Sequence, residues 1–106
     1  MDIAWSKTAK ESLKATLRNI KKNFGDSVAR EIRQEIESQT SMLSLQPMMG
    51  KEDVEHSSDD RRFRYIIVKR RSRIYYMLED HTIHVLLVWD VRQDIQQLKQ
   101  VLEKFK

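Results

Sequence analysis

The 106-residue sequence contains no cysteine, so it can form neither a disulfide framework nor a thiolate metal site. None of its apolar runs approaches the roughly 18–20 residues that are needed to cross a bilayer, and its N-terminus lacks the apolar core of a signal peptide. These absences predict a soluble cytoplasmic protein. We expect no metal, no cofactor and no membrane partner.

The residues that are present are sufficient for a folded domain. Hydrophobic side chains make up 40% of the chain and charged side chains 34%, which is too apolar for a disordered segment. The length fits a single domain that spans residues 1–106.

The net charge of +4 is modest, but its distribution along the chain is uneven. Residues 51–60 are mostly acidic, whereas residues 61–73 hold seven arginines and lysines and no acidic side chain. Such a block predicts a local positive patch of the kind that attracts phosphates.

Three consecutive β-strands are predicted in the C-terminal half of the chain. Phe63–Lys69, Arg73–Glu79 and Thr82–Trp89 are rich in the β-branched and aromatic side chains that a half-buried sheet selects. The connectors between them are short and polar. Because a parallel return needs a crossover of about a dozen residues or more, these strands must be antiparallel neighbours.

The N-terminal part predicts a brief strand at Asp2–Trp5 and then a helix. Thr8 and Glu11 have the spacing of a capping box at the start of this helix. Apolar residues then recur at helical spacing, at Ala9, Leu13, Leu17, Ile20 and Phe24.

Gly25 is predicted to end this first helix, because glycine adopts the left-handed conformation that helix C-termini need. Asp26 or Ser27 can cap a second helix, and a connection this short implies an antiparallel hairpin. The inward stripe of the second helix is Val28, Ile32 and Ile36.

An irregular crossover is expected over residues 42–50, which contain the only proline. Asp94 and Gln97 again have capping-box spacing and predict a last short helix. The predicted order is therefore β-α-α-β-β-β-α. This is an α+β fold with the helical hairpin on one face of a small, mainly antiparallel sheet.

Several segments in this order resemble the RelE/ParE superfamily of bacterial type II toxin–antitoxin toxins. The matching segments are residues 3–6 (Ile-x-Trp-Ser), 45–50 (Leu-x-Pro-x-x-Gly), 73–76 (Arg-Ile-Tyr-Tyr) and 83–94, which ends in Trp-Asp-x-Arg-Gln-Asp. Each motif is weak alone, but their order and spacing are specific, and the resemblance covers nearly the whole chain.

The resemblance implies a small toxin that a cognate antitoxin neutralises in a hetero-oligomeric complex, by covering the sheet or the helical hairpin. Members similar to RelE cleave mRNA in the ribosomal A site and are endoribonucleases. Members similar to ParE inhibit DNA gyrase and are not nucleases. The sequence leaves these two targets open, and with them the question of enzymatic activity.

Strand alternation predicts which side chains share a face. The uniformly apolar set of the last strand, Ile83, Val85, Leu87 and Trp89, is expected to face the helices. The opposite, open face is then expected to combine Arg62, Arg64, Arg73, Tyr75 and His84.

RNA cleavage by 2′-hydroxyl attack needs a base and cations around the crowded phosphate. By resemblance, Arg64 and Arg73 match basic positions of RelE-like nucleases and Arg92 falls near a third, while His84 is a candidate proton-transfer group. The candidate target-binding residues are Arg61, Arg62, Lys69, Arg70, Arg71 and Tyr75.

Other features favour different readings. Ile66 replaces a lysine that such nucleases usually carry, and the last helix has no tyrosine. A non-catalytic module that binds nucleic acid or protein would use the same basic face. The cations could also serve structure alone. Arginines such as Arg61, Arg62, Arg70 and Arg71 could be solvated charges that protect a sheet edge, and Arg73 could form an ion pair with Glu79 or Asp90.

Overall fold

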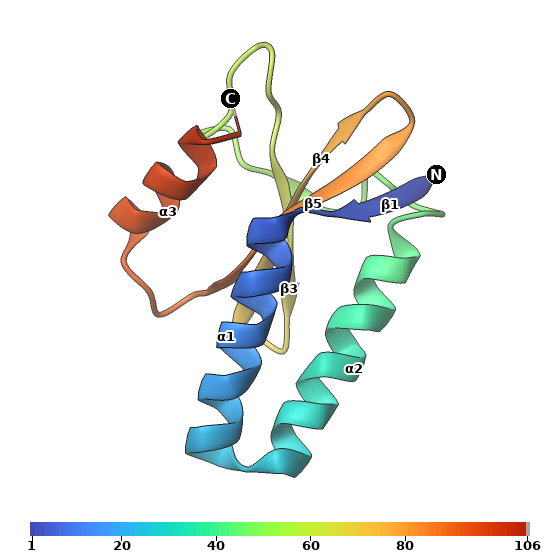
Figure 1. Ribbon diagram of the computed structural model, residues 1–106. Coiled ribbons are helices and arrows are strands. Elements are labelled where there is room, and N and C mark those ends of the chain that lie inside the picture. The colour runs from blue at the N-terminus through green and yellow to red at the C-terminus, as the bar shows by residue number, and fades with distance from the viewer. Residues whose placement is uncertain (106) are drawn as a thin grey trace.

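A computed structural model describes residues 1–105. The elements are β1 (Asp2–Trp5), α1 (Lys7–Phe24), α2 (Asp26–Met42), β2 (Lys51–Glu52), β3 (Arg64–Val68), β4 (Ser72–Glu79), β5 (Thr82–Asp90) and α3 (Ile95–Glu103). Figure 1 shows the α1–α2 hairpin, the sheet and α3. The α+β prediction is confirmed, and each of the predicted elements is present with bounds close to those expected.

The sheet has five strands in the order β1-β5-β4-β3-β2. Only β1 runs parallel to its neighbour β5, so the predicted mainly antiparallel sheet is confirmed. β2 was not predicted: it pairs two residues with β3, with Lys51 opposite Tyr65 and Glu52 opposite Arg64. A two-residue edge strand carries no periodicity that sequence analysis can detect.

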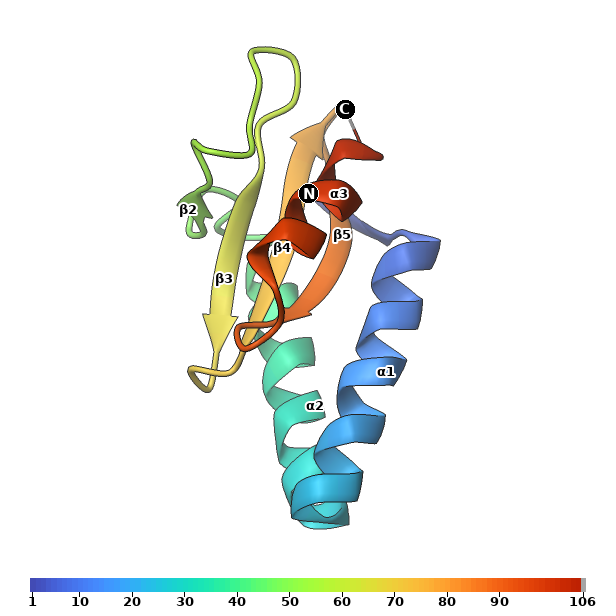
Figure 2. The same cartoon turned by 90° about the vertical axis from the view of Figure 1, so that its left-hand side faces the viewer.

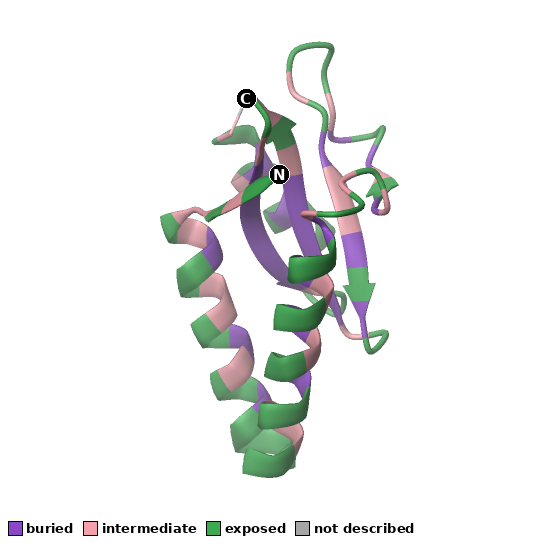
Figure 3. Ribbon diagram, turned by 90° about the vertical axis from the view of Figure 1, so that its right-hand side faces the viewer, coloured by how far each residue is buried: buried purple, intermediate pink, exposed green. Residues whose placement is uncertain are grey.

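Both faces of the sheet are covered (Figures 1 and 2). The helical hairpin packs on one face, where Ile20, Ile32 and Ile36 meet sheet residues such as Ile74 and Val85. α3 packs on the other through Leu98 and Leu102, against residues that include Phe63, Tyr75 and Trp89. The expectation of an open face was therefore wrong. Figure 3 shows buried residues along the central strands and exposed ones on the outer sides of the helices.

A β-bulge in β5 explains why strand alternation failed there. Tyr75 lies opposite Leu87, but its neighbour Tyr76 lies opposite Val85, so Leu86 is an extra residue. Beyond the bulge the alternation is inverted. Leu87 and Trp89, predicted to face the hairpin, therefore belong to the cluster beneath α3.

Two serines of the α1 region take over as partners of β5 where β1 ends. Ser6 donates its backbone N–H to the carbonyl of Val85 (3.0 Å) and its hydroxyl to the carbonyl of Leu86 (3.1 Å). Ser12 Oγ accepts from the N–H of Val88 at 2.9 Å. The bulged strand thus keeps its buried backbone groups hydrogen-bonded without another strand beside it.

Two of the predicted helix caps were wrong. Ser6, not Thr8, is the N-cap of α1, and its hydroxyl accepts from the N–H of Ala9 at 2.9 Å. α2 follows Gly25 directly and has no side-chain cap, so neither Asp26 nor Ser27 acts as one. The cap of α3 was correct, since the Asp94 side chain accepts from the N–H of Gln96. Gly25 ends α1 with φ of 93°, as expected.

The two tight turns of the sheet use non-glycine residues in the left-handed region. Lys69 and Arg70 have φ of 53° and 58°, and Asp80 and His81 have φ of 51° and 63°. Positive φ at both central positions is typical of the type I′ hairpin turn, which prefers Asn-Gly or Asp-Gly. No helix among residues 1–105 is long and apolar enough to cross a membrane.

The crossover before β2 is fixed by the buried ring of Tyr76. Its hydroxyl accepts from the N–H of Gly50 at 2.9 Å and donates to the carbonyl of Pro47 at 2.8 Å. A Cβ at residue 50 would lie 2.5 Å from that hydroxyl, so only glycine allows this approach. The Gly50 of the sequence motif therefore has a structural explanation.

Tyr76→Phe is expected to lower the free energy of unfolding by about 1–3 kcal/mol, because it leaves the buried N–H of Gly50 without a partner. Tyr65→Phe is the matched control, since the hydroxyl of this half-buried tyrosine makes no hydrogen bond among residues 1–105. Chemical denaturation of both variants measures the difference. Equal effects would contradict the assigned role of the Tyr76 hydroxyl.

Candidate functional site

Arg73 lies at the centre of an aromatic cluster on the face that α3 covers in part. Its guanidinium carbon sits 4.4 Å from the centroid of the Tyr65 ring, a cation–π contact. Its Nη1 donates to the Tyr75 hydroxyl at 3.0 Å. The two tyrosine rings lie 5.3 Å apart, because Tyr65 and Tyr75 face each other across β3 and β4.

This environment changes the ionisation of both polar groups. Burial raises the pKa of Tyr75 to about 12, although the hydrogen bond from Arg73 opposes that change. Burial is the largest single influence on Arg73 and works against its charge. The hydrogen bond to Tyr75 and the electrostatic interactions with Tyr75, Tyr65 and Asp53 together outweigh it, so the pKa of Arg73 is raised. Arg73 is therefore a fixed cation, and its buried Nε has no hydrogen-bond partner among the described residues. It pairs with neither Glu79 nor Asp90, as one sequence reading had allowed.

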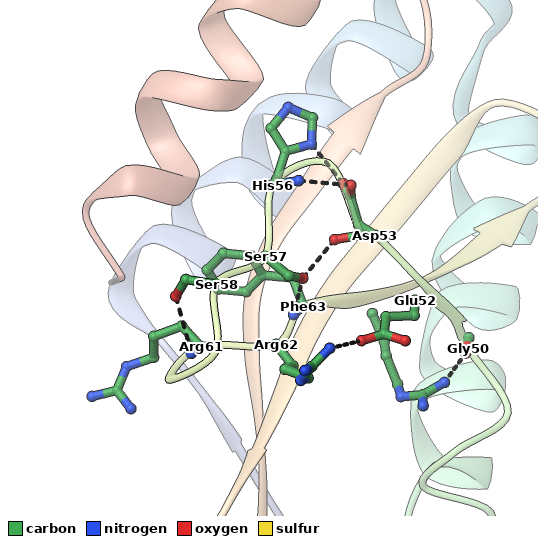
Figure 4. Close-up of polar contacts among 10 residues, drawn as sticks. Gly50, Glu52, Asp53, His56, Ser57, Ser58, Arg61, Arg62 and Phe63 are labelled. Carbon is green, nitrogen blue, oxygen red and sulfur yellow. Dashed lines mark hydrogen bonds and ion pairs between the residues drawn. The ribbon is translucent and has the colours of Figure 1, made fainter.

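A buried Asp53–His56 pair lies in the segment between β2 and β3 (Figure 4). His56 Nδ1 is 2.7 Å from an Asp53 carboxylate oxygen, and the N–H of His56 donates to the other oxygen at 3.1 Å. The N–H of Asp53 donates to the carbonyl of Phe63 at 2.8 Å. The aspartate thus orients the imidazole and leaves Nε2 without a hydrogen-bond partner among residues 1–105.

Sequence analysis assigned no functional role to this pair. The detectable signal was local: an aspartate three residues before the histidine accepts its backbone N–H, as in the turns that aspartate stabilises. The packing of the turn against Phe63 depends on tertiary structure and has no sequence signature.

A cleft of about 400 Å³ joins the pair to the aromatic cluster. Asp53, His56, Tyr65, Arg73 and Ile95 are among its lining residues. Lys51, Glu52 and Glu55 also line it, so the cleft combines an oriented histidine and two cations with carboxylates.

Arg64 does not belong to this cluster. Because Tyr65 pairs with Tyr75, Arg64 points to the opposite face of the sheet together with Tyr76, and the expected combination of Arg64 with Arg73 was wrong. Arg64 Nη1 donates to the carbonyl of Gly50 at 2.7 Å and lies 3.4 Å from that of Met48. It thus holds the crossover before β2.

The two other candidate catalytic residues also lie apart from Arg73. His84 is opposite Met77, four residues further along β4, which corresponds to about 13 Å of strand. Arg92, after β5, forms a two-pronged ion pair with Asp90, at 3.3 Å and 3.0 Å. The hydrogen bond from Arg92 lowers the pKa of Asp90. The same hydrogen bond raises the pKa of Arg92. The four candidates do not form one constellation.

Among the candidate target-binding residues, two arginines before β3 form exposed ion pairs. Arg61 lies 3.3 Å from a carboxylate oxygen of Glu79, and Arg62 lies 2.8 Å from one of Glu52. The hydrogen bond to Glu52 raises the pKa of Arg62. Tyr75, a third candidate, is fully buried beneath α3 and so cannot stack on a nucleobase.

The other three candidates gather at the β3–β4 turn together with Arg92. Lys69, Arg70, Arg71 and Arg92 line a hollow of about 280 Å³, and we call these four residues the basic end of the sheet. Val91 N–H donates to the carbonyl of Arg71 at 2.8 Å, which joins the turn to the segment after β5.

A second basic surface lies between α1 and α2, and we call it the hairpin groove. Its volume is about 460 Å³, and its lining is Lys14, Leu17, Arg18, Lys21, Ala29, Arg30 and Arg33. Lys21 pairs with Asp26 and Arg33 with Glu37, whereas Lys14, Arg18 and Arg30 have no partner among residues 1–105. The sequence prediction used only the apolar residues of α1. It gave no role to the cations of that helix. Within the same residues, no group of three or more histidine and acidic side chains is arranged to hold a metal ion.

Comparison with known proteins identifies the class to which this fold and these surfaces belong. The chain is similar to a solved structure described as a chromosomal ParDE TA system from P. aeruginosa, with a TM-score of 0.69 and 19% sequence identity. The similarity covers 87% of this chain and 97% of the other. At that identity the likeness establishes the shared fold.

The family assignment comes from the sequence. The family model of the ParE toxin of the type II toxin–antitoxin system parDE matches residues 3–95. The chain therefore belongs to the ParE toxin family, within the RelE/ParE superfamily that its motifs resemble. It is a type II toxin–antitoxin toxin, and its membership of a ParDE system implies a complex with a cognate ParD antitoxin. No curated protein matches the chain.

Arg64→Ala is expected to lower the free energy of unfolding by about 1–2 kcal/mol, because a charged donor to a backbone carbonyl is lost. Arg18→Ala, on the exposed side of α1, should stay within about 0.5 kcal/mol of the parent. Thermal unfolding followed by circular dichroism compares the two. A neutral Arg64→Ala variant would contradict the structural role given to this arginine.

Proposed function

We propose that this toxin arrests growth by binding and inhibiting DNA gyrase, and that it does so without cleaving nucleic acid. The observation that carries the proposal is the dispersal of the candidate catalytic residues. Arg64 holds a loop on the hairpin face, Arg92 is engaged by Asp90, and His84 lies about 13 Å of strand from Arg73. Membership of the ParE family supports the same target.

Inhibition by binding needs a shaped surface and no general base. The half-buried arginine, the paired cations and the covered sheet are compatible with such a surface. An RNA-cleaving site instead needs a base, an in-line phosphate and cations that converge on one point. Gyrase is a cytoplasmic target, in keeping with the compartment expected from the sequence.

The hairpin groove is our candidate seat for the antitoxin. Leu17 and Ala29 provide an apolar floor, and the cations that line the groove have no acidic side chain among them. An amphipathic acidic helix complements this arrangement, with apolar residues on the floor and carboxylates toward Lys14, Arg18 and Arg30.

RNA cleavage remains a second candidate because of one specific observation. The Asp53–His56 pair and Arg73 line the same cleft, which would offer His56 Nε2 as a base and Arg73 as a phosphate ligand. Glu52 and Glu55 line the cleft as well and would repel a phosphate. We therefore rank this activity second.

A supercoiling assay with purified gyrase is the direct test. We expect dose-dependent inhibition of supercoiling by the full chain, while cell-free translation proceeds and the reporter mRNA stays intact. New mRNA 5′ ends that appear only during translation would overturn the gyrase proposal in favour of cleavage. In that case His56→Gln should abolish the new ends, whereas His84→Gln should not.

Charge reversal tests the antitoxin seat. Lys14→Glu with Arg18→Glu is expected to weaken antitoxin binding by tenfold or more, about 1.4 kcal/mol, because two unpaired cations become like charges. Lys10→Glu with Lys99→Glu reverses the same charge on exposed residues outside the groove. Isothermal titration calorimetry measures both. Equal affinities of the two double variants would exclude the groove as the seat.

A further inference from the structure

We propose that the basic end of the sheet binds the sugar–phosphate backbone of duplex DNA. The proposal concerns direct binding of DNA by this chain and does not depend on gyrase being the target. It assigns a ligand to Lys69, Arg70, Arg71 and Arg92. Inhibition of an enzyme does not by itself explain why these four cations lie together.

The four side chains converge on one hollow from two separate segments. Three come from the β3–β4 turn and one from the segment after β5, above a floor that includes Ile32 and Val91. The turn is closed by the Arg71 N–H, which donates to the carbonyl of Val68 at 3.0 Å. Three guanidinium groups provide planar donors suited to phosphate oxygens.

The acidic neighbours of these cations do not neutralise them. Lys69 lies 3.5 Å from Glu31 and Arg92 lies 3.0 Å from Asp90, while Arg70 has no ion-pair partner among residues 1–105. Lys69 and Glu31 are both well exposed, so their ion pair contributes little. Asp90 is less exposed and holds Arg92 through two bonds, but the Arg92 side chain itself stays exposed. Two carboxylates against four cations leave an excess of positive charge that a phosphate can use.

The backbone of the turn is a second observation that points to a ligand. Lys69 and Arg70 adopt the left-handed conformation that branched and long side chains disfavour, and in which Asn-Gly would be preferred. The other turn, at the far end of β4, begins with Asp80, a residue that tolerates this conformation. The β3–β4 turn therefore has a lysine and an arginine at positions where its backbone conformation favours asparagine and glycine.

The aromatic residues near this end favour a duplex over a single strand. The ring of Phe24 is covered by the guanidinium of Arg71, whose carbon lies 4.3 Å from the ring centroid. Tyr65 is engaged by Arg73, and Tyr75 is buried. Recognition of single strands relies on free rings on which bases stack. Cations without such rings suit the backbone of a duplex.

Fluorescence anisotropy with a short labelled DNA duplex, repeated over a series of salt concentrations, tests the proposal. The full chain should bind with an affinity that falls as salt rises, with a log–log slope between about −2 and −4 for two to four phosphates neutralised. Lys69→Asn with Arg70→Gly should bind at least tenfold more weakly and reduce the slope by about 2. The same variant should melt at a higher temperature, because its turn residues suit the backbone.

The matched control is Lys10→Gln with Lys99→Gln, which removes the same charge from exposed helical positions and should leave binding nearly unchanged. Lys69→Gln with Arg70→Gln is a second variant that keeps the non-glycine turn, and it should lose binding without gaining thermal stability. Absence of binding at low salt, an equal loss in the control, or tighter binding of single-stranded RNA would each overturn the proposal.

Discussion

The fold depends on one irregularity in its longest strand. Without the extra residue at Leu86, the alternate side chains Ile83, Val85, Leu87 and Trp89 would all face the helical hairpin. The bulge divides them, so Ile83 and Val85 complete the core under the hairpin and Leu87 and Trp89 complete the core under α3. A small sheet thereby acquires two buried faces, and Ser6 and Ser12 supply the hydrogen bonds that make the irregular strand tolerable.

Cations that lie close together in the sequence have different structural roles in this protein. Arg64 and Arg73 lie nine residues apart and on opposite faces; one fastens a loop through backbone carbonyls, the other is enclosed by tyrosines. At the β3–β4 turn and in the hairpin groove, by contrast, Arg70, Lys14, Arg18 and Arg30 have no ion-pair partner among residues 1–105. This division gives a protein of the ParE family two basic surfaces, the basic end of the sheet and the hairpin groove.

Apart from the two-residue β2, the sequence predicted the element order, the approximate strand bounds and the family, because these rest on local periodicity, short connectors and ordered motifs. It failed where tertiary contacts decide. Thr8 has capping-box spacing, but Ser6 caps α1 because its hydroxyl also reaches β5. The side of the sheet to which Leu87 and Trp89 point is set by a β-bulge, which residue spacing does not reveal. The grouping of Arg64 with Arg73 required a strand register, and the Asp53–His56 pair required a loop packed on Phe63.

The shortness of β2 leaves β3 incompletely paired. β2 covers β3 only at Arg64 and Tyr65, so among residues 1–105 no strand lies along the outer edge from Ile66 to Val68, where the Ile67 side chain is 53% exposed. An uncovered edge of this kind invites a second copy to add its own strand, which is the first step of aggregation. Lys69, Arg70 and Arg71 stand at the end of that edge. The like charges of these residues on two copies oppose such edge-to-edge pairing.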